Sequence, residues 1–577
     1  MSCRFKPSQI FSFALYEARN AAEAAVLYAT HSMKVLRSSA ALALSITFAA
    51  TFASCQGCHT TRSGGSTAAD ASTAIPTLRI VALSSVAGAL EPCGCTKDQL
   101  GGVDHLAALL RSTLTSAPER MVLSVGPLFF SDPTSRADRV DQDRWKADAI
   151  AGAARAIGLS AWTPGSNDLA LGASELARLR DLSGAPLLAA NLSPLPDSAG
   201  FAPSLVREVG ELKVALIGLT AARFPESQAT SNVDAPALAL SKQLDMARKQ
   251  GAQVTIVLAA IARGEALRLA DAYPDIDLLL VGKTDERGPA NDAAKPPTMI
   301  GSTLVVETPN HLQAVALIDL FVSDTSKGDV KLADGGGIQR VEEVLSLSNR
   351  IRDLEHRINS AEREPSTRAD DIAARKADLA KLREQKAALE KVSSPVAGNY
   401  FRYRLVEVRD GLGSDAAVRE QMLAYYKRVN DNNKVAFRDR KPPEASPRQP
   451  TFVGVEACTT CHDEPRKVWD KTPHAGAYGT LQREFKEFNL DCVSCHVTGY
   501  GKPAGSTVTW NDKLQNVQCE ECHGPGSLHA KKPNDKRLII AKPSPESCVS
   551  SCHHSPHVEG FDAQAKMKLV LGPGHGE

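Results

Sequence analysis

The chain has 577 residues, with 67 Lys and Arg against 66 Asp and Glu and a formal net charge of +1 at pH 7. This length accommodates two or three domains with their own cores, and the balanced charge argues against a role in binding nucleic acid. Thirteen cysteines exceed what an ordinary cytosolic enzyme carries, so they require a specific explanation.

Residues 1–54 are interpreted as an extended start followed by an export signal. Met33 opens the stretch MKVLRSSAALALSITFAATFASC, in which two basic residues precede an apolar run that ends in small residues. Signal peptides carry their charges near the true terminus, so we expect translation to begin at Met33. The pattern predicts export, with a periplasmic location in a bacterium.

Cys55 opens the next segment, residues 55–76, and has two interpretations. FASC resembles a lipoprotein cleavage box, after which the acylated Cys55 would tether the linker that follows to a membrane by lipid alone. CQGCH, with Cys55, Cys58 and His59, also has the spacing of a haem attachment site. One thiol cannot serve both roles, and we favour the lipid because the apolar run stops at the expected distance.

Residues 77–335 alternate short apolar segments with amphipathic stretches such as residues 143–157. The buried-strand candidates are LRIVAL, MVLSV, PLLAANL, KVALIGL, VTIVLAA, DIDLLLVG and TLVVET. Strands that alternate with helices in this way predict an α/β layered core.

In chain order these pieces resemble the metallophosphoesterase domain of 5′-nucleotidases, from LRIVALSSVAGALEP through TPGSNDLALG and VALIGLT to IDLLLVGKTDE. The resemblance implies two β-sheets flanked by helices, and a site where Asp, Asn and His hold two metal ions. The residues at the family's ligand positions are here Ser85, Ala87, Pro127, Ser166, Asn167, Asp168, Ala260, Lys283 and Asp285. Without imidazoles, and with a lysine among them, we expect a scaffold that has lost hydrolysis.

The stretch EPCGCTKDQLGG places Cys93 and Cys95 one residue apart. It resembles a CGC motif carried by a 5′-nucleotidase-like subfamily, which implies a redox-active or metal-binding thiol pair. The alternative is a structural disulfide or a free pair beside a glycine turn in an oxidising compartment.

Residues 340–393 show an apolar heptad pattern that includes Val344, Ile351 and Ile358, breaks near Pro365 and then resumes. The pattern predicts an antiparallel coiled-coil hairpin that acts as a spacer or a dimerisation arm, or a solvated helix pair packed on the body. Residues 396–440 are expected to form a small mixed β/α segment, and residues 441–450 a Pro-rich linker.

Residues 451–577 repeat the pentad Cys-x-x-Cys-His. This spacing is typical of covalent haem c, in which two thiols bind the haem and the following histidine is the proximal iron ligand. The attachment candidates are Cys458, Cys461, Cys492, Cys495, Cys519, Cys522 and, with one extra residue between the thiols, Cys548 and Cys552; the proximal candidates are His462, His496, His523 and His553. A zinc site gives no reason for a histidine after every pair, so we expect about four haems per chain.

Haem iron also takes a distal ligand or keeps an open face. Nine of the 14 histidines lie after residue 461, which leaves five distal candidates: His474, His529, His554, His557 and His575. His554 and His557 are alternative candidates for one distal position.

The stretches CVSCHVTGYG, VQCEECHGPGSLHA and GPGHG resemble the tetraheme cytochromes c of the ammonia-oxidation type. The resemblance implies a mostly α-helical and irregular multihaem domain with histidine axial ligands and stacked haems. We therefore expect an electron-transfer protein with redox partner proteins. The alternative is a reductase of a small substrate, such as a nitrogen oxide or a disulfide, that uses an open haem or the Cys93/Cys95 pair.

Overall fold

A computed structural model describes residues 75–575, except 93–98, 114–115, 118, 193–199, 224–232, 289, 326–327, 329, 337, 363–366, 391–397 and 555–560. All the described residues belong to one compact unit of the chain. Met33, Cys55, Cys58, His59, Cys93, Cys95 and His557 lie outside the described residues.

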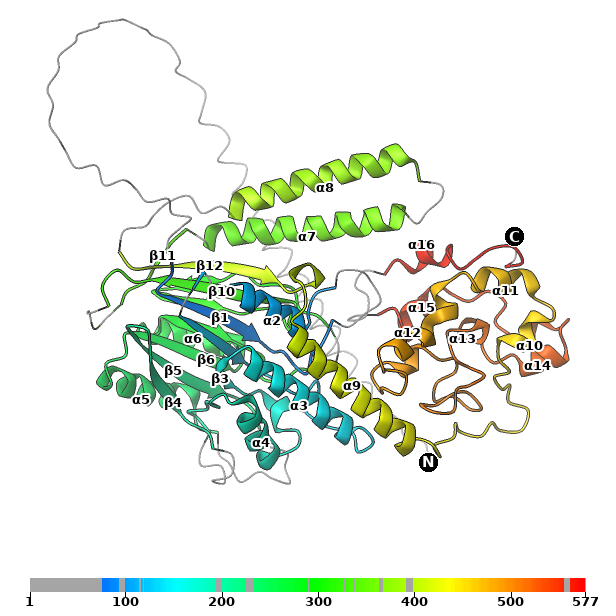
Figure 1. Cartoon of the computed structure of the whole chain (residues 1–577), viewed down its shortest axis with the longest axis horizontal. Helices are drawn as coiled ribbons and strands as arrows, with labels where there is room; N and C mark the ends of the chain where they lie inside the picture. Colours follow the sequence, from blue (N-terminus) through cyan, green and yellow to red (C-terminus); the bar gives the residue numbers. More distant parts are fainter. Residues whose placement is uncertain are drawn as a thin grey trace, which may run out of the picture. The chain divides into compact units, whose positions relative to one another are not determined.

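The first β-sheet has six strands in the order β11-β12-β10-β1-β2-β3 (Figure 1). Strand β1 (Leu78–Ser84) pairs parallel with β2 (Arg120–Val125), which pairs parallel with β3 (Leu159–Thr163). On its other side β1 pairs antiparallel with β10 (Ala314–Phe321), and β10 pairs antiparallel with β12 (Tyr400–Glu407). The two-residue strand β11 (Ala333–Asp334) closes the edge. Residues 400–407 are therefore part of this sheet, although about 80 residues separate them from β10.

The second sheet has the order β4-β5-β6-β7-β9-β8, in which β5, β6, β7 and β9 run parallel. Its strands are β4 (Ser204–Val209), β5 (Leu212–Thr220), β6 (Val254–Ala260), β7 (Leu278–Val281), β8 (Thr298–Ile300) and β9 (Thr303–Val306). The inner strands are buried on both faces, which explains why they appear in the sequence as continuous apolar runs.

Three hydrophobic layers hold the two sheets and their helices together. Ile80, Leu123, Leu216 and Ile256 meet between the sheets. The first sheet is covered on its outer face by α2 (Val103–Ser112), α3 (Val140–Ala156), α4 (Ala173–Ser183) and α9 (Ala416–Ala436), and the second by α5 (Pro236–Lys249) and α6 (Arg263–Ala272). The predicted α/β layered core, with two sheets flanked by helices, is confirmed.

One strand expectation was wrong in its extent. Residues 186–192 make only isolated bridges, such as Trp162 to Leu187 and Leu188 to Ala202, and form no continuous strand. The segment crosses from the first sheet to the second, so its backbone hydrogen bonds are divided among several partners, including Trp162, Ala202 and Gly218.

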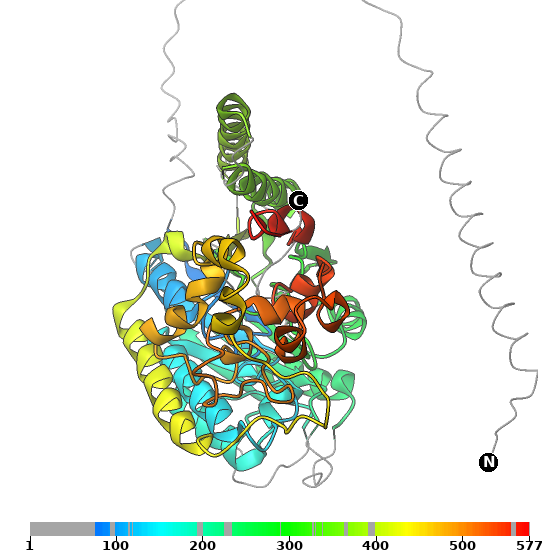
Figure 2. The ribbon, with the colours of Figure 1, turned by 90° about the vertical axis from the view of Figure 1, so that its right-hand side faces the viewer.

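Helices α7 (Ile338–Ala361) and α8 (Ala369–Glu390) pack against each other, as the heptad pattern predicts (Figure 1; Figure 2). Ile351, Ile358 and Leu379 form the apolar contact, and Arg383 of α8 donates to Glu355 of α7 at 2.7 Å. The break near Pro365 lies outside the described residues.

The C-terminal segment consists of short helices and loops. Its helices are α10 (Val455–Thr459), α11 (Asp463–Trp469), α12 (Ala477–Arg483), α13 (Cys519–His523), α14 (Ser527–Lys531), α15 (Glu546–Ser551) and α16 (Ala563–Met567). The buried apolar cluster recorded here is small: Phe437, Tyr478, Val493, Val497 and Val508. Protein side chains alone provide little core for a segment of this length, which is typical of domains that fold around a prosthetic group.

Candidate functional sites: the strand ends and the haem motifs

The residues at the positions that hold metal ions in the 5′-nucleotidase resemblance lie together where the parallel strands of both sheets end. Ser85 and Ala87 follow β1 in left-handed backbone conformations, with φ of 49° and 48°. The backbone N–H of Lys283, two residues after β7, donates to the Ser85 hydroxyl at 2.9 Å. The fold therefore assembles these positions as the resemblance implies, but with different side chains.

Asp168 is buried in the 3₁₀ helix Ser166–Leu169. Its carboxylate accepts N–H groups of Leu128 and Phe129 after β2, at 3.0 and 2.8 Å, and of Gly165 at 3.1 Å. Burial raises the pKa of Asp168 to about 7, although the three N–H donors act in the opposite direction. Asp168 thus ties two strand ends together.

Lys283 lies at the centre of a polar cluster at these strand ends. Its Nζ forms ion pairs with Glu286 at 2.8 Å and with Asp292 at 2.7 Å. Burial lowers the pKa of the nearby His311, although the charges of Glu286 and Asp292 act in the opposite direction. Asp285 points instead to Arg287, at 2.9 Å. Across the described ranges, no group of three or more His, Cys, Asp or Glu side chains is arranged to hold a metal ion.

The four haem-type motifs of the C-terminal segment fall on short helical turns. Cys458 lies in α10, residues 493–495 form a 3₁₀ turn, residues 519–523 form α13 and Cys548 lies in α15. Thiols of different motifs are neighbours, because Cys458 and Cys519 lie close enough to shift each other's pKa, and so do Cys495 and Cys552. The first motif therefore contacts the third, and the second contacts the fourth.

A buried carboxylate inside the third motif connects it to the first. Glu520 accepts the N–H groups of Val453 at 3.0 Å, Gly454 at 2.7 Å and Gly526 at 2.7 Å, and it is 1% exposed. Charge-assisted hydrogen bonds to backbone N–H groups are stronger than neutral ones. Sequence reasoning missed this residue because the positions between the two thiols carry no expected chemistry.

Two pairs of histidines face each other at a spacing that suits one iron between them. The ring centroids of His462 and His529 are 6.3 Å apart, and those of His474 and His553 are 6.1 Å apart. With metal–nitrogen bonds of about 2 Å on each side and a ring radius of about 1 Å, two axial imidazoles have centroids about 6 Å apart. The residues present therefore fit a haem iron at both places.

The remaining proximal candidates are oriented by backbone carbonyls. Nδ1 of His496 is 2.6 Å from the carbonyl oxygen of Ala477, and Nδ1 of His523 is 2.7 Å from that of Ile540. A hydrogen bond at Nδ1 leaves Nε2 available to a metal. Burial lowers the pKa of both His496 and His523, so each ring is neutral at pH 7, as ligation requires.

Among the other distal candidates, His575 lies near His523 and, like burial, lowers its pKa. The Nδ1 atoms of His529 and His575 are buried without a hydrogen-bond partner in the described part of the chain. A metal ion satisfies such a nitrogen. His554 lies near Cys495 and is one of the groups that lower the pKa of that thiol, to about 6, with the hydrogen bond from Cys552 the largest cause.

Helices α3 and α9 of the α/β layers hold the segment that leads into the second motif. Asp491, which directly precedes Cys492, forms ion pairs with Arg139 at 2.7 Å and Lys146 at 3.2 Å. Burial opposes ionisation, but these two cations hold the pKa of Asp491 below its ordinary value. The amide of Gln142 in α3 donates to Asn489 at 3.2 Å and accepts from Asn433 in α9 at 3.0 Å. We call these six side chains the Asp491 clamp.

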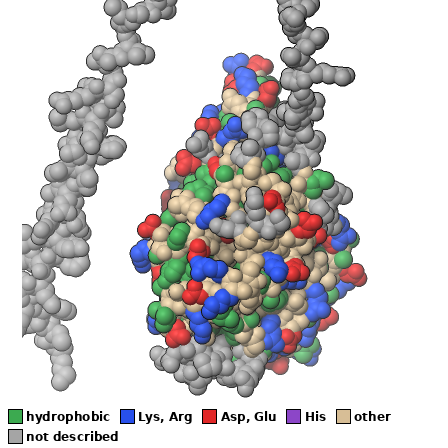
Figure 3. Space-filling model, turned by 90° about the vertical axis from the view of Figure 1, so that its left-hand side faces the viewer, with side chains coloured by type: hydrophobic (Ala, Val, Ile, Leu, Met, Phe, Trp, Pro, Cys, Tyr) green, Lys and Arg blue, Asp and Glu red, His purple; other side chains and the backbone are tan. Residues whose placement is uncertain are grey.

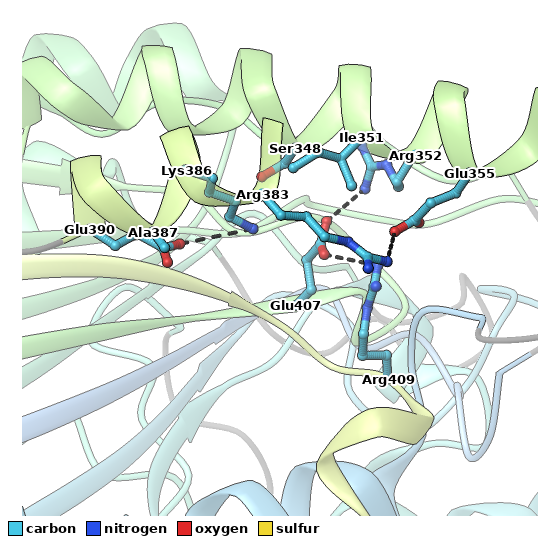
Figure 4. Close-up of a pocket in the computed structure, with 10 residues that line it drawn as sticks. All are labelled: Ser348, Ile351, Arg352, Glu355, Arg383, Lys386, Ala387, Glu390, Glu407 and Arg409. Atoms are coloured by element: carbon cyan, nitrogen blue, oxygen red, sulfur yellow. Dashed lines mark hydrogen bonds and ion pairs between the residues drawn. The ribbon is translucent and has the colours of Figure 1, made fainter. Parts of the chain in front are cut away.

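A cavity of about 220 Å³ lies apart from these sites, between the helix pair α7–α8 and the end of β12 (Figure 4). Its charged groups pair with one another: Glu407 with Arg352 at 3.0 Å and with Arg409 at 2.9 Å, and Lys386 with Glu390 at 3.9 Å. The positive and negative side chains are likewise interspersed on the face drawn in Figure 3. Neither feature singles out a ligand.

The four motifs and their histidines have the pattern of covalent haem c attachment sites. Residues 457–524 match the family model described as cytochrome c554 and c-prime. The chain is 34% identical to cytochrome c-554 of Nitrosomonas europaea over 91 residues, which are 13% of this chain and 39% of that protein. The chain thus spans about two fifths of the length of that relative.

Solved structures that resemble the chain include enzymes that act on nucleotides and phosphoesters. The 5′-nucleotidase precursor from Thermus thermophilus is 16% identical, with a TM-score of 0.41 over 70% of this chain and 67% of that one. The NAD nucleotidase of Haemophilus influenzae is 18% identical, with a TM-score of 0.35 over 43% and 48%. The calcineurin-like phosphoesterase YfkN of Bacillus subtilis is 17% identical, with a TM-score of 0.33 over 42% and 84%.

Among the described residues, every helix is too short or too polar to cross a membrane.

Proposed function

We propose that the chain is an exported multihaem cytochrome that transfers electrons through four covalently bound haems. The observation that carries the proposal is the spacing of the ring pairs His462–His529 and His474–His553, 6.3 and 6.1 Å, which suits bis-histidine haem. Haem bound in this way supplies reversible one-electron chemistry and has no free face for a substrate. The paired thiols of different motifs support a relay, because they bring the attachment points of different haems into contact.

In this proposal the α/β domain is an inactive nucleotidase-like scaffold. Lys283, with its ion pairs to Glu286 and Asp292, occupies the strand ends where a nucleotidase would bind metal. A cation among the candidate ligands repels divalent ions. What the scaffold binds is the second haem motif of the same chain, through the Asp491 clamp.

The location belongs to the same proposal. The export signal before Cys55 agrees with haem c, which is attached outside the cytoplasm, and acylation of Cys55 would anchor the protein to a bacterial membrane. Its partners would be redox proteins.

A second candidate function is reduction of a small substrate at the haem of the second motif. Within the described residues, no histidine ring is recorded against His496 at the spacing seen for His462 and His553. A haem with an open face binds small molecules such as nitrogen oxides. The Cys93/Cys95 pair, fed by the haems, is the other route to a reductase.

The test is an intact-mass measurement on the exported protein, combined with optical and electron paramagnetic resonance spectra. We expect four haems and mostly low-spin iron. Five haems would assign Cys55 and Cys58 to haem attachment and would remove the lipid anchor. Stoichiometric binding of carbon monoxide by one haem of the unmutated reduced protein would replace the pure relay with the reductase.

A further inference from the structure

One stretch of the cytochrome domain is strongly basic and exposed. Residues 531–542, here called the lysine segment, contain five cationic side chains and one acidic one. The cations are Lys531, Lys532, Lys536, Arg537 and Lys542, and all five are exposed. The acidic residue, Asp535, is paired with Arg537 at 2.8 Å.

The four lysines of the segment have no ion pair within the described part of the chain. Some cations elsewhere in the same domain are paired, such as Arg466 with Asp470 at 2.8 Å and Lys502 with Glu521 at 3.3 Å. The lysine segment therefore presents uncompensated positive charge to a partner.

The segment also begins and ends at haem ligands. Lys531 and Lys532 follow His529, which faces His462, and the backbone N–H of Lys532 donates to the His529 carbonyl at 2.9 Å. At the other end, the Ile540 N–H donates to the carbonyl of His523 at 3.0 Å, and the Ile540 carbonyl lies 2.7 Å from Nδ1 of the same histidine. The segment is thus hydrogen-bonded through its backbone to His529, which pairs with His462 of the first motif, and to His523 of the third motif.

An apolar side chain is exposed within this basic surface. The side chain of Ile540 is 54% exposed, although its backbone N–H and carbonyl are both hydrogen-bonded to His523, the proximal candidate of the third motif. Protein interfaces place apolar contacts at the centre and charged groups at the rim, and electrostatic complementarity accelerates the encounter.

We propose that the lysine segment is the docking surface for an acidic redox protein, which exchanges electrons with the haems of the first and third motifs. This inference rests on the proposed electron-transfer function and adds the site and chemistry of the partner. A single electron passes between the haem iron and the redox centre of the partner, so one is oxidised as the other is reduced.

The test uses the full-length haem-loaded protein and the charge-reversal variant Lys536→Glu/Lys542→Glu. The matched control is Lys242→Glu/Lys249→Glu on α5, which makes the same change in net charge at two exposed positions of the α/β domain. Oxidation of the reduced proteins is followed by stopped-flow spectroscopy with two oxidants of opposite charge. Ferricyanide is the anionic oxidant and tris(phenanthroline)cobalt(III) is the cationic one.

We expect the unmutated protein to react faster with ferricyanide at low salt and to lose this advantage as salt is added. The Lys536/Lys542 variant should react about tenfold more slowly with ferricyanide and faster with the cobalt cation, whereas the control stays near the unmutated rates. Poly-glutamate, a probe for an acidic protein surface, should slow the unmutated protein and the control but not the variant.

Equal ferricyanide rates for all three proteins would overturn the docking surface and leave electron transfer intact. The docking surface would also be overturned if the Lys536/Lys542 variant lost haem or shifted its absorption spectrum while the salt dependence of its oxidation rate stayed unchanged. The lysines would then stabilise haem binding and would not bind a partner. A chain without reducible haem would overturn the proposed function as well.

Discussion

Replacement of Asp491 by asparagine tests how firmly the α/β domain holds the second haem motif. Asparagine keeps the shape of the side chain but removes the charge that pairs with Arg139 at 2.7 Å and with Lys146 at 3.2 Å. Exposed ion pairs contribute about 0–1 kcal/mol, and breaking a buried pair costs about 3–5 kcal/mol. The three side chains are 20–30% exposed, and Arg139 retains Asp143, so we expect a loss of about 2 kcal/mol.

A loss of about 2 kcal/mol makes local opening roughly 30-fold more frequent. Hydrogen exchange followed by mass spectrometry should show this acceleration in peptides that cover residues 484–498 and α3, with α5 and α6 unchanged. The control is Asp141→Asn on α3. Asp141 is 68% exposed and lies 3.9 Å from Arg144, so this variant should exchange like the unmutated protein. Unchanged exchange in Asp491→Asn with full haem content would refute the idea that these charges hold the motif.

Three further predictions concern the two sites. His529→Ala should convert one haem to a high-spin form that binds carbon monoxide, seen in optical spectra, whereas His105→Ala in the α/β domain should not; an unchanged spectrum would remove His529 from the iron. The protein should not hydrolyse nucleotides or p-nitrophenyl phosphate with any divalent metal, and turnover that disappears on mutation of Asp168 and Asp285 would contradict this. Because burial raises the pKa of Asp168 to about 7, the folded state binds more protons than the unfolded state between about pH 4 and 7. The advantage of the unmutated protein over Asp168→Asn in urea unfolding should therefore shrink as the pH rises through that window, and a constant difference would refute it.

The haem motifs and the parallel strands could be predicted because their signals are local. A thiol pair with its histidine spans five or six residues, and a strand buried on both faces is apolar along its whole length. Strand β10 was missed although it is just as buried, since Asp319 interrupts the apolar run. The Arg79 guanidinium neutralises that aspartate from the neighbouring strand, with Nη2 2.8 Å from Oδ2, and nothing in the local sequence reveals this partner.

Long-range pairings could not be predicted for the same reason. Five histidines were recognised as distal candidates, but the pairing of His529 with His462 depends on how α11 and α14 come together across 67 residues. Asp491 and Asn489 look like ordinary loop residues until α3 is placed beside them. Glu520 occupies a variable position between the two thiols of the motif. Only the structure shows that it is buried and accepts backbone N–H groups from the segment before the first motif.

The place of β12 in the first sheet has a consequence for how the protein can be divided and made. The strand lies between β10 and β11 and leads into α9, so the helix pair α7–α8 is an insertion within one folding unit. A fragment that stops at residue 335 would leave the edge of β10 and the apolar surface under Val418, Met422 and Val429 uncovered. As the exported chain emerges, the α/β domain cannot be completed until the end of α9 at residue 436 has crossed the membrane, when the first haem cysteine, Cys458, is only 22 residues away. Completion of the α/β domain and the start of haem attachment are therefore nearly consecutive events.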